Sequence, residues 1–377
     1  MQAEGIEFEK TTWEEALKKA QEEDKILFVD AYAQWCGPCK TMSRNVFTDD
    51  AVGAYYNKNF VNLKLDMETP DGASFNKKYK VTAYPTLIFL DGSGKLVKKS
   101  VGGKKIEDFL DLGELALRSN DKSGEYAEKY DSGVRDFNTV YGYVKALNNV
   151  GKPSLKIANE YLSSEHNMSA KQEALFVYES AIEADSRIFD QLIEHKERII
   201  EEVGQEDFEE KVISACKTTL DKGVEYDMKM LYDEALEKCE KAIGKSAAVQ
   251  NLKFEMDYYH QMRDEEKYLN AAKKLVKKHG KKNTQLYAYV SDDIHEKYKE
   301  NEKKMALSAD YYSKYYKKNK NAESAYFYCR KLILSKDYEK ALTVAEEGLG
   351  GEKAEKMATR LKSLIQYIEQ TQKSEKG

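Results

Sequence analysis

The chain has 377 residues, of which 41 % are hydrophobic and 34 % are charged, and its formal net charge is −5. This length predicts two or three domains. The charges are mixed in sign, which is typical of solvated helix faces and argues against a nucleic-acid surface. No apolar run is long enough to cross a membrane, so we expect no membrane span.

The first ten residues, MQAEGIEFEK, are polar and acidic and carry no secretory signal. Two locations stay open. Either the sequence is a mature exported form that has lost its signal peptide, which we expect to be periplasmic, or the protein is cytoplasmic.

The first third of the chain alternates helix and strand signals. A capping box of Thr12 and Glu15 predicts a helix start, and Thr69 followed by Pro70 predicts another. Asp91-Gly92 predicts a hairpin turn. We expect strands at 25–32, 60–66, 86–91 and 95–101, in a sheet covered by helices on both faces.

From Ser119 onward the pattern changes to helices alone, and no proline follows Pro153. We therefore expect a first domain at 1–118, a polar linker at 119–124 and an α-helical domain at 125–377.

A repeat runs through the helical part. Ala235, Ala271, Ala306 and Ala341 follow one another at steps of 35 or 36 residues. Small residues at a fixed step allow neighbouring helices to pack closely. Residues 225–350 resemble tetratricopeptide repeats, which implies stacked helix pairs that bind protein segments. The alternative is an inert extension whose many tyrosines only pack helix against helix.

The stretch FVDAYAQWCGPCK carries Cys36 and Cys39, which have three possible roles. Zinc needs about four ligands, but the next cysteine is Cys216 and the first histidine is His166. A structural disulfide around a two-residue loop restrains the unfolded chain very little. The redox interpretation is favoured, so we expect no metal and no cofactor beyond a redox-active Cys36–Cys39 disulfide.

The pair lies where a predicted strand passes into a helix. A helix N-terminus stabilises a thiolate, so we expect Cys36 there with its sulfur exposed and with a thiol more acidic than a free one. Gly37 keeps the turn open and Pro38 suits a first helical turn. Cys39, one turn later and more buried, is placed to attack the mixed disulfide formed at Cys36.

Three other residues complete the candidate site. Asp30 interrupts an apolar strand, so it is either a solvent-facing aspartate or the proton acceptor for Cys39. Pro85, after Tyr84, is either an edge proline or part of a cis-proline loop facing Cys36. Trp35 is either a packing residue or a flat surface beside the sulfur.

Residues 5–118 resemble the thioredoxin family through Asp30, the WCGPCK motif of residues 35–40, Pro85 and Gly92. The resemblance implies the α/β thioredoxin fold, a central mixed sheet with helices on both faces, and disulfide exchange with Cys36 as nucleophile and Cys39 as resolving thiol. It also implies that substrate contacts Trp35, Gly37, Pro38, Tyr84 and Pro85.

The resemblance is strongest to the thioredoxin-like domains of exported bacterial thiol-disulfide proteins. One departure is Asn62, which stands where small thioredoxins commonly carry a lysine near the buried aspartate. We expect Cys216, Cys239 and Cys329 to be buried residues of helices, with a Cys216–Cys239 disulfide as the alternative.

The resulting hypothesis is an enzyme, a thiol-disulfide oxidoreductase that reduces or exchanges disulfides in protein substrates. Its partners would be those substrates and a thiol redox partner, with protein recognition by the helical domain and no nucleic acid. The alternative is a repeat-based interaction or scaffold protein whose first domain is a redox switch or vestigial.

Overall fold

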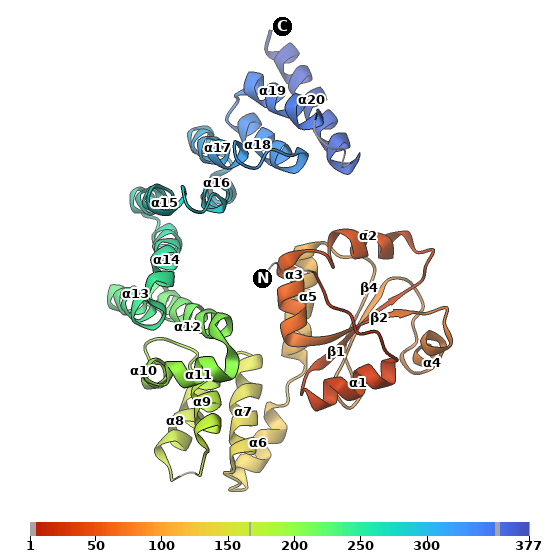
Figure 1. Ribbon diagram of the computed structural model, residues 1–377, viewed down its shortest axis with the longest axis vertical. Helices are drawn as coiled ribbons and strands as arrows, with labels where there is room; N and C mark the ends of the chain where they lie inside the picture. The colour runs from red at the N-terminus through yellow and green to blue at the C-terminus, as the bar shows by residue number, and fades with distance from the viewer. Residues whose placement is uncertain (1–4, 166, 351–354, 377) are drawn as a thin grey trace. The chain divides into compact units, whose positions relative to one another are not determined.

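The structure is a computed structural model that describes residues 5–165, 167–350 and 355–376, so that His166 lies outside the described residues. The chain divides into two compact units, Met1–Ser180 and Ala181–Gly377. Figure 1 shows a sheet with its helices in the first unit and helices alone in the second.

The first unit begins with alternating helices and strands and ends with helices only. Its elements are α1 (Trp13–Glu22), β1 (Ile26–Tyr32), α2 (Gly37–Asn45), α3 (Asp50–Asn59), β2 (Phe60–Asp66), α4 (Pro70–Tyr79), β3 (Thr86–Leu90), β4 (Leu96–Val101), α5 (Ile106–Ser119), α6 (Ser123–Asp131), α7 (Phe137–Asn149), α8 (Leu155–Ser163) and α9 (Ala170–Ser180).

The predicted helix starts are confirmed. Thr12 and Glu15 form the capping box of α1, and Thr69 caps α4, whose first residue is Pro70. These side chains satisfy backbone N–H groups that have no partner inside the helix.

The sheet is mixed, with strand order β2-β1-β3-β4. Strand β1 pairs with β2 in parallel and with β3 in antiparallel orientation, and β3 and β4 form the predicted hairpin. Strand β1 therefore lies inside the sheet, hydrogen-bonded on both edges. The predicted strands and the thioredoxin fold are confirmed.

A separate apolar core covers each face of the sheet. On one face, Trp13 of α1 and Phe75 of α4 pack against Val29 and Ile88. On the other face, Phe28 and Tyr56 pack with side chains of α2, α3 and α5. Because β1 is buried on both faces, its sequence reads as a nearly continuous apolar run.

Helices α6 to α9 belong to the first compact unit. Asp24, which follows α1, forms an ion pair with Lys122 at 2.9 Å and another with Lys145 of α7 at 3.7 Å. The predicted linker, 119–124, spans the last residue of α5 and the first two of α6. The predicted domain boundary stays a prediction.

The second unit is helical throughout its described residues. Its elements are α10 (Arg187–Glu194), α11 (Lys196–Val203), α12 (Gln205–Glu225), α13 (Lys229–Ile243), a short 3-10 helix (Gly244–Ser246), α14 (Ala247–Gln261), α15 (Glu265–His279), α16 (Gln285–Tyr298), α17 (Glu302–Tyr316), α18 (Ala322–Leu334), α19 (Tyr338–Leu349) and α20 (Glu355–Lys376). No helix in the described residues is both long and apolar enough to cross a membrane.

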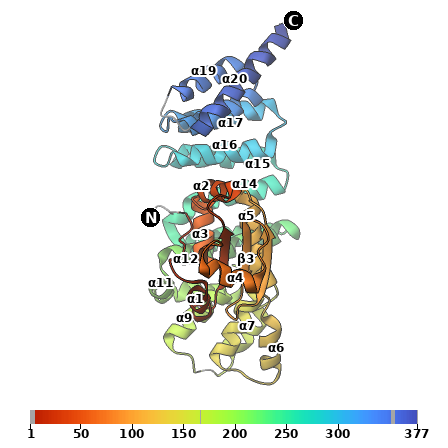
Figure 2. The same cartoon turned by 90° about the vertical axis from the view of Figure 1, so that its right-hand side faces the viewer.

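Helices α12 to α19 pack as consecutive pairs, which Figure 2 shows for the later helices. Ala235, Ala271 and Ala341 are fully buried in the second helix of their pairs. Ala306 of α17 is exposed, and Ser308 is buried instead. The expectation for Ala306 was therefore wrong by two positions.

Ser308 makes a polar contact across its helix pair. Its hydroxyl donates to the backbone oxygen of Ser291 in α16 at 2.8 Å, and the Ser291 hydroxyl donates to the Ser308 backbone oxygen at 2.7 Å. Small side chains on both helices let the backbones approach closely enough for this exchange.

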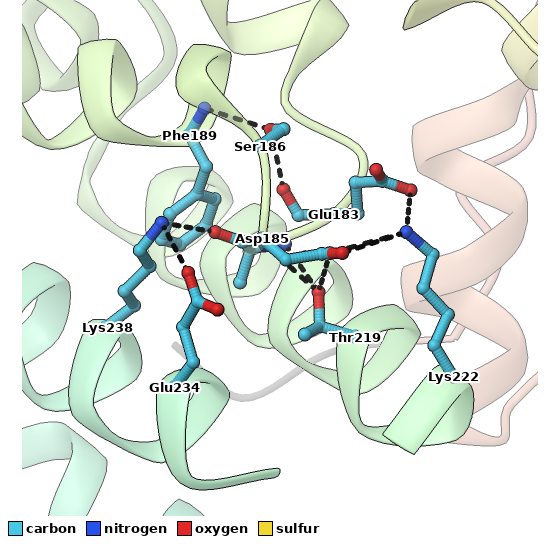
Figure 3. A network of polar contacts seen from close by, with 9 residues as sticks. Glu183, Asp185, Ser186, Phe189, Thr219, Lys222, Glu234 and Lys238 are labelled. Atoms are coloured by element: carbon cyan, nitrogen blue, oxygen red, sulfur yellow. Dashed lines mark hydrogen bonds and ion pairs between the residues drawn. The ribbon is translucent and has the colours of Figure 1, made fainter. Parts of the chain in front are cut away.

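The segment before α10 is held to α12 and α13 by the polar network drawn in Figure 3. Lys222 of α12 pairs with Glu183 at 2.6 Å and Asp185 at 3.1 Å. Buried Thr219 accepts the backbone N–H of Ala184 at 2.8 Å and donates to Asp185 at 2.6 Å.

Replacing Thr219 with valine keeps the shape of the side chain but removes both bonds. We expect a loss of about 1–3 kcal/mol in the free energy of unfolding, because the Asp185 backbone N–H loses its partner, while Ala184 and the Asp185 carboxylate keep only their contacts with Ala215 and Lys222. Urea unfolding followed by circular dichroism measures this loss, and faster hydrogen exchange at the Ala184 amide locates it.

Thr218→Val is the matched control, because Thr218 is the exposed neighbour on the same helix. Its change should stay within about 0.5 kcal/mol. Equal losses for both variants would show that the network contributes nothing specific.

Candidate functional site

Cys36 stands at the turn between β1 and α2, in the N-cap position of the helix. Its sulfur accepts the backbone N–H of Cys39 at 3.1 Å. Gly37 and Pro38 form the first two positions of α2, and a side chain added at Gly37 would meet open space. The predicted helix start at the cysteines is confirmed, and the helix terminus directs an N–H group at the sulfur that would carry negative charge.

Cys36 and Cys39 form a disulfide with 5.3 Å between their Cα atoms. Cys36 is 3 % exposed and Cys39 is 2 % exposed. The expectation of an exposed Cys36 was therefore wrong, and Cys39 is the more buried of the two by only a small margin. Ala33 and the side chains of Tyr32 and Tyr84 pack around the pair, so most directions of approach are closed.

An aromatic surface borders the disulfide. Trp35 is 68 % exposed, and its ring meets that of Tyr84 edge to face at 5.7 Å. The indole N–H donates to Glu68 at 2.8 Å, which fixes the orientation of the ring. The Tyr84–Pro85 peptide bond is cis, as the sequence predicts. Trp35 and Tyr84 therefore present apolar area where a partner would approach.

Asp30 lies in the middle of β1 and is 1 % exposed. The alternative of a solvent-facing aspartate is therefore wrong, because neighbouring strands and helices cover both faces of β1. Neither carboxylate oxygen has a hydrogen-bond partner within the described structure. Burial raises the pKa of Asp30 to about 7, and the positive charge of Lys64 opposes that rise.

Lys64 is the site residue that the sequence interpretation missed. It stands directly opposite Asp30 in the parallel ladder between β1 and β2, and its amino group donates to the hydroxyl of Ser43 in α2. Asn62, the position where the resemblance placed the usual lysine near the buried aspartate, stands opposite Phe28 and donates to the backbone oxygen of Tyr56 at 3.4 Å. A lysine inside the apolar strand VNLKLDM was the available signal.

A pocket of about 290 Å³ opens beside the cysteines. Its lining includes Cys39, Lys64, Tyr32 and Ser43. Lys64 thus contacts the same pocket as Cys39 while it stands opposite Asp30 in the sheet. The pocket has room for water, which can carry a proton between groups that do not touch.

In the part of the chain that the structure describes, the remaining cysteines and the acidic residues form no second centre. Within the described residues, no group of three His, Cys, Asp or Glu side chains is placed to hold a metal. Cys216, Cys239 and Cys329 are buried free thiols, as expected, and the alternative Cys216–Cys239 disulfide is not formed. Burial raises the pKa of Cys329 to about 12.

Comparison with known proteins gives a matching family, similar relatives and a similar solved structure. Residues 8–92 match the model of a family described as thioredoxin-like. Thioredoxin H1 of Arabidopsis thaliana is 38 % identical over 97 residues, which cover 26 % of this chain and 78 % of that protein. The thiol:disulfide interchange protein DsbD of Pseudoalteromonas atlantica is 27 % identical over 108 residues, 28 % of this chain and 18 % of that protein.

Among solved structures, a candidate disulphide-isomerase from Bacteroides thetaiotaomicron is 48 % identical. The match covers 31 % of this chain and 97 % of that one, with a TM-score of 0.29.

The burial of Asp30 predicts a stability that depends on pH. Below about pH 4 the carboxyl is neutral in both the folded and the unfolded chain. Between pH 4 and 7 the unfolded chain ionises while the folded one keeps its proton, so folding loses up to about 4 kcal/mol. Asp30→Asn should remove this loss, so the variant gains on the wild type as pH rises to 7.

Urea unfolding at pH 4 and pH 8, followed by tryptophan fluorescence, measures this difference. Trp13 and Trp35 are the only tryptophans of the chain, so the signal reports on the sheet domain. Asp108→Asn removes an exposed carboxyl of α5 and keeps Asp30, so it should show the same dependence on pH as the wild type. A parallel pH dependence in wild type and Asp30→Asn would contradict the assignment.

Proposed function

Because the chain belongs to the thioredoxin-like family, whose members are thiol-disulfide oxidoreductases, we propose that it reduces or exchanges disulfides in protein substrates through Cys36 and Cys39. One observation carries this proposal. Cys36 caps α2, where its sulfur accepts an N–H bond beside the exposed ring of Trp35.

The reaction has two exchanges. The Cys36 thiolate attacks one sulfur of the substrate disulfide, the substrate S–S bond breaks, and the other substrate sulfur leaves as a thiolate. Cys39, once deprotonated, attacks the sulfur of Cys36, which forms the intramolecular disulfide and releases the second substrate thiol. Two electrons pass to the substrate, and a thiol reductant returns the Cys36–Cys39 pair to dithiol.

We assign the deprotonation of Cys39 to Asp30, acting through water in the pocket that Cys39 shares with Lys64. A carboxyl with a pKa of about 7 suits this task, because proton exchange is efficient when the pKa of the base lies near the working pH. The substrate-contacting surface in this proposal consists of Trp35, Gly37, Pro38, Tyr84 and Pro85. Their support is the aromatic contact at 5.7 Å between Trp35 and Tyr84 and the open space above Gly37.

The helical region, in this proposal, recognises the partner protein through tetratricopeptide-like helix pairs. Its support is the paired packing of α12 to α19 and the burial of small residues near a constant step. We place the protein in the periplasm on its likeness to exported thiol-disulfide proteins. Osmotic-shock fractionation of the native cells tests this location, and recovery with the cytoplasmic fraction would overturn it.

The central test is reduction of a protein disulfide, such as those of insulin, with dithiothreitol as the terminal reductant. Cys36→Ser should lower the rate by at least about 100-fold, because the attacking thiolate is gone. Cys39→Ser should accumulate a mixed disulfide at Cys36, which mass spectrometry identifies.

Cys329→Ala is the matched control, since it removes a buried thiol of α18 and leaves the pair intact. Its rate should equal that of the wild type. If wild type and Cys36→Ser reduce insulin equally fast, the proposed activity is wrong.

Asp30→Asn tests the role of the buried carboxyl in the second exchange. Without a proton acceptor, release of the second substrate thiol should slow by about 10-fold or more, while the first attack by Cys36 keeps its rate. In the wild type the rate of release should rise through about pH 7, where Asp30 ionises.

Single-turnover experiments with a fluorescent disulfide separate the two steps. Asp108→Asn again serves as the control for loss of one carboxylate. Release that is equally fast in Asp30→Asn and shows the same dependence on pH would leave Asp30 with a structural role only.

A further inference from the structure

The second unit carries a concentrated positive surface on one helix. Between Lys267 and Lys282 the chain has seven lysines and no acidic residue, although its net charge is −5. Most of these lysines lie on α15, and the others follow directly after the helix. The next acidic residue after Lys282 is Asp292. We call this set, namely Lys267, Lys273, Lys274, Lys277, Lys278, Lys281 and Lys282, the α15 lysine surface.

Helical geometry places these charges in solvent. The opposite side of α15 is the buried one and includes Tyr268, Ala272 and Leu275, whereas Lys273, Lys274 and Lys277 are exposed. Residues spaced by three, four and seven positions share a face of a helix, so the five lysines of α15 form a continuous strip.

Several other lysines of this unit pair with carboxylates, and Lys267 of the α15 lysine surface pairs with Asp264 at 2.8 Å. Lys297 pairs with Asp293 at 2.7 Å, and Lys331 pairs with Asp292 at 2.5 Å. In contrast, Lys273 and Lys277 have no ion pair within the described part of the chain. Favourable interaction with the helix dipole accounts for lysines in the last turn of α15, but not for Lys273 or for those beyond the helix.

The strip borders a pocket of about 340 Å³ between α14 and α15, neighbours in Figure 1. Four lysines of the α15 lysine surface line it, together with Asn270, Glu255 and Tyr259. Lys274 is 3.7 Å from Glu255, a long contact for an ion pair. The pocket therefore keeps a positive excess beside an amide group and one carboxylate.

We propose that the α15 lysine surface binds an acidic segment of the protein substrate, an inference that rests on the proposed function and names the class of substrate. Glutamate and aspartate side chains pair with the lysines, and backbone N–H groups of the segment donate to Glu255 and to the oxygen of Asn270. A protein segment offers both kinds of partner, whereas the phosphodiester groups of a nucleic acid or a lipid offer only acceptors and no donor for Glu255.

Tyr259 supports the same choice of partner. Its ring packs edge to face on Tyr258 at 5.3 Å and lies 5.1 Å from the amino group of Lys267. The ring thus already contacts Tyr258 and the amino group of Lys267, and these contacts compete with the stacking of a base.

The test uses two synthetic disulfide peptides that differ only in a tail of glutamates or of glutamines. The full-length protein reduces each with dithiothreitol as the terminal reductant. Several exposed charge pairs should lower KM for the glutamate peptide by about 10-fold relative to the glutamine peptide. The value of kcat should stay unchanged, because the tail does not touch Cys36 or Cys39.

Lys273→Glu with Lys277→Glu should abolish the preference for the glutamate tail, and the glutamine pair at the same positions should reduce it. The matched control, Lys318→Glu with Lys362→Glu, changes net charge equally at exposed sites outside the α15 lysine surface and should keep the preference. Circular dichroism confirms that each variant keeps its helix content.

Three outcomes would overturn the proposal. The two peptides would have equal KM values in the wild type, or the control pair would lose the preference as fully as the Lys273 and Lys277 pair. The third is tighter binding of single-stranded DNA or phosphatidylserine vesicles than of the glutamate peptide. Failure of the proposed function is distinct, since then neither peptide would be reduced at all.

Discussion

The burial of one unpaired carboxyl, that of Asp30, determines how the stability of the first unit depends on pH. Strand β1 is hydrogen-bonded on both edges and covered on both faces, so this group cannot turn to water. Lys64 lies opposite on β2 and reduces the cost of the charge, but burial outweighs it and the pKa stands near 7. The sheet thus gives up stability at neutral pH to keep a buried carboxyl opposite Lys64, which lines the pocket of Cys39.

Local signals predicted the elements of the sheet domain, and contacts between distant segments explain what was missed. Caps such as Thr12 and Thr69 act within one helical turn, so the sequence shows them directly. The position of Lys64 opposite Asp30 depends on the register of two parallel strands, which no local pattern specifies. The burial of Cys36 depends on the loop that carries Tyr84, far along the chain.

In the helical region, periodicity predicted the pairing of helices better than it predicted individual residues. The step between repeats varies, so a fixed spacing led to exposed Ala306 while Ser308 makes the contact with α16. The distribution of charge was likewise poorly predicted from the composition of the whole chain. The whole chain mixes both signs, which predicts solvated helix faces and argued against a nucleic-acid surface, yet the lysines of α15 gather on one side of a single helix. An average over the chain conceals a segment of this kind.

The burial of the other three thiols has a consequence for the protein's own integrity. A chain that repeatedly forms and opens a reactive disulfide is at risk of cross-linking itself through any accessible cysteine. Cys216, Cys239 and Cys329 are fully buried in helices, and thiols without access to solvent exchange slowly. Helix packing thereby prevents disulfide exchange between the redox pair and the other three cysteines. Repeated turnover therefore produces no wrong disulfides within the chain.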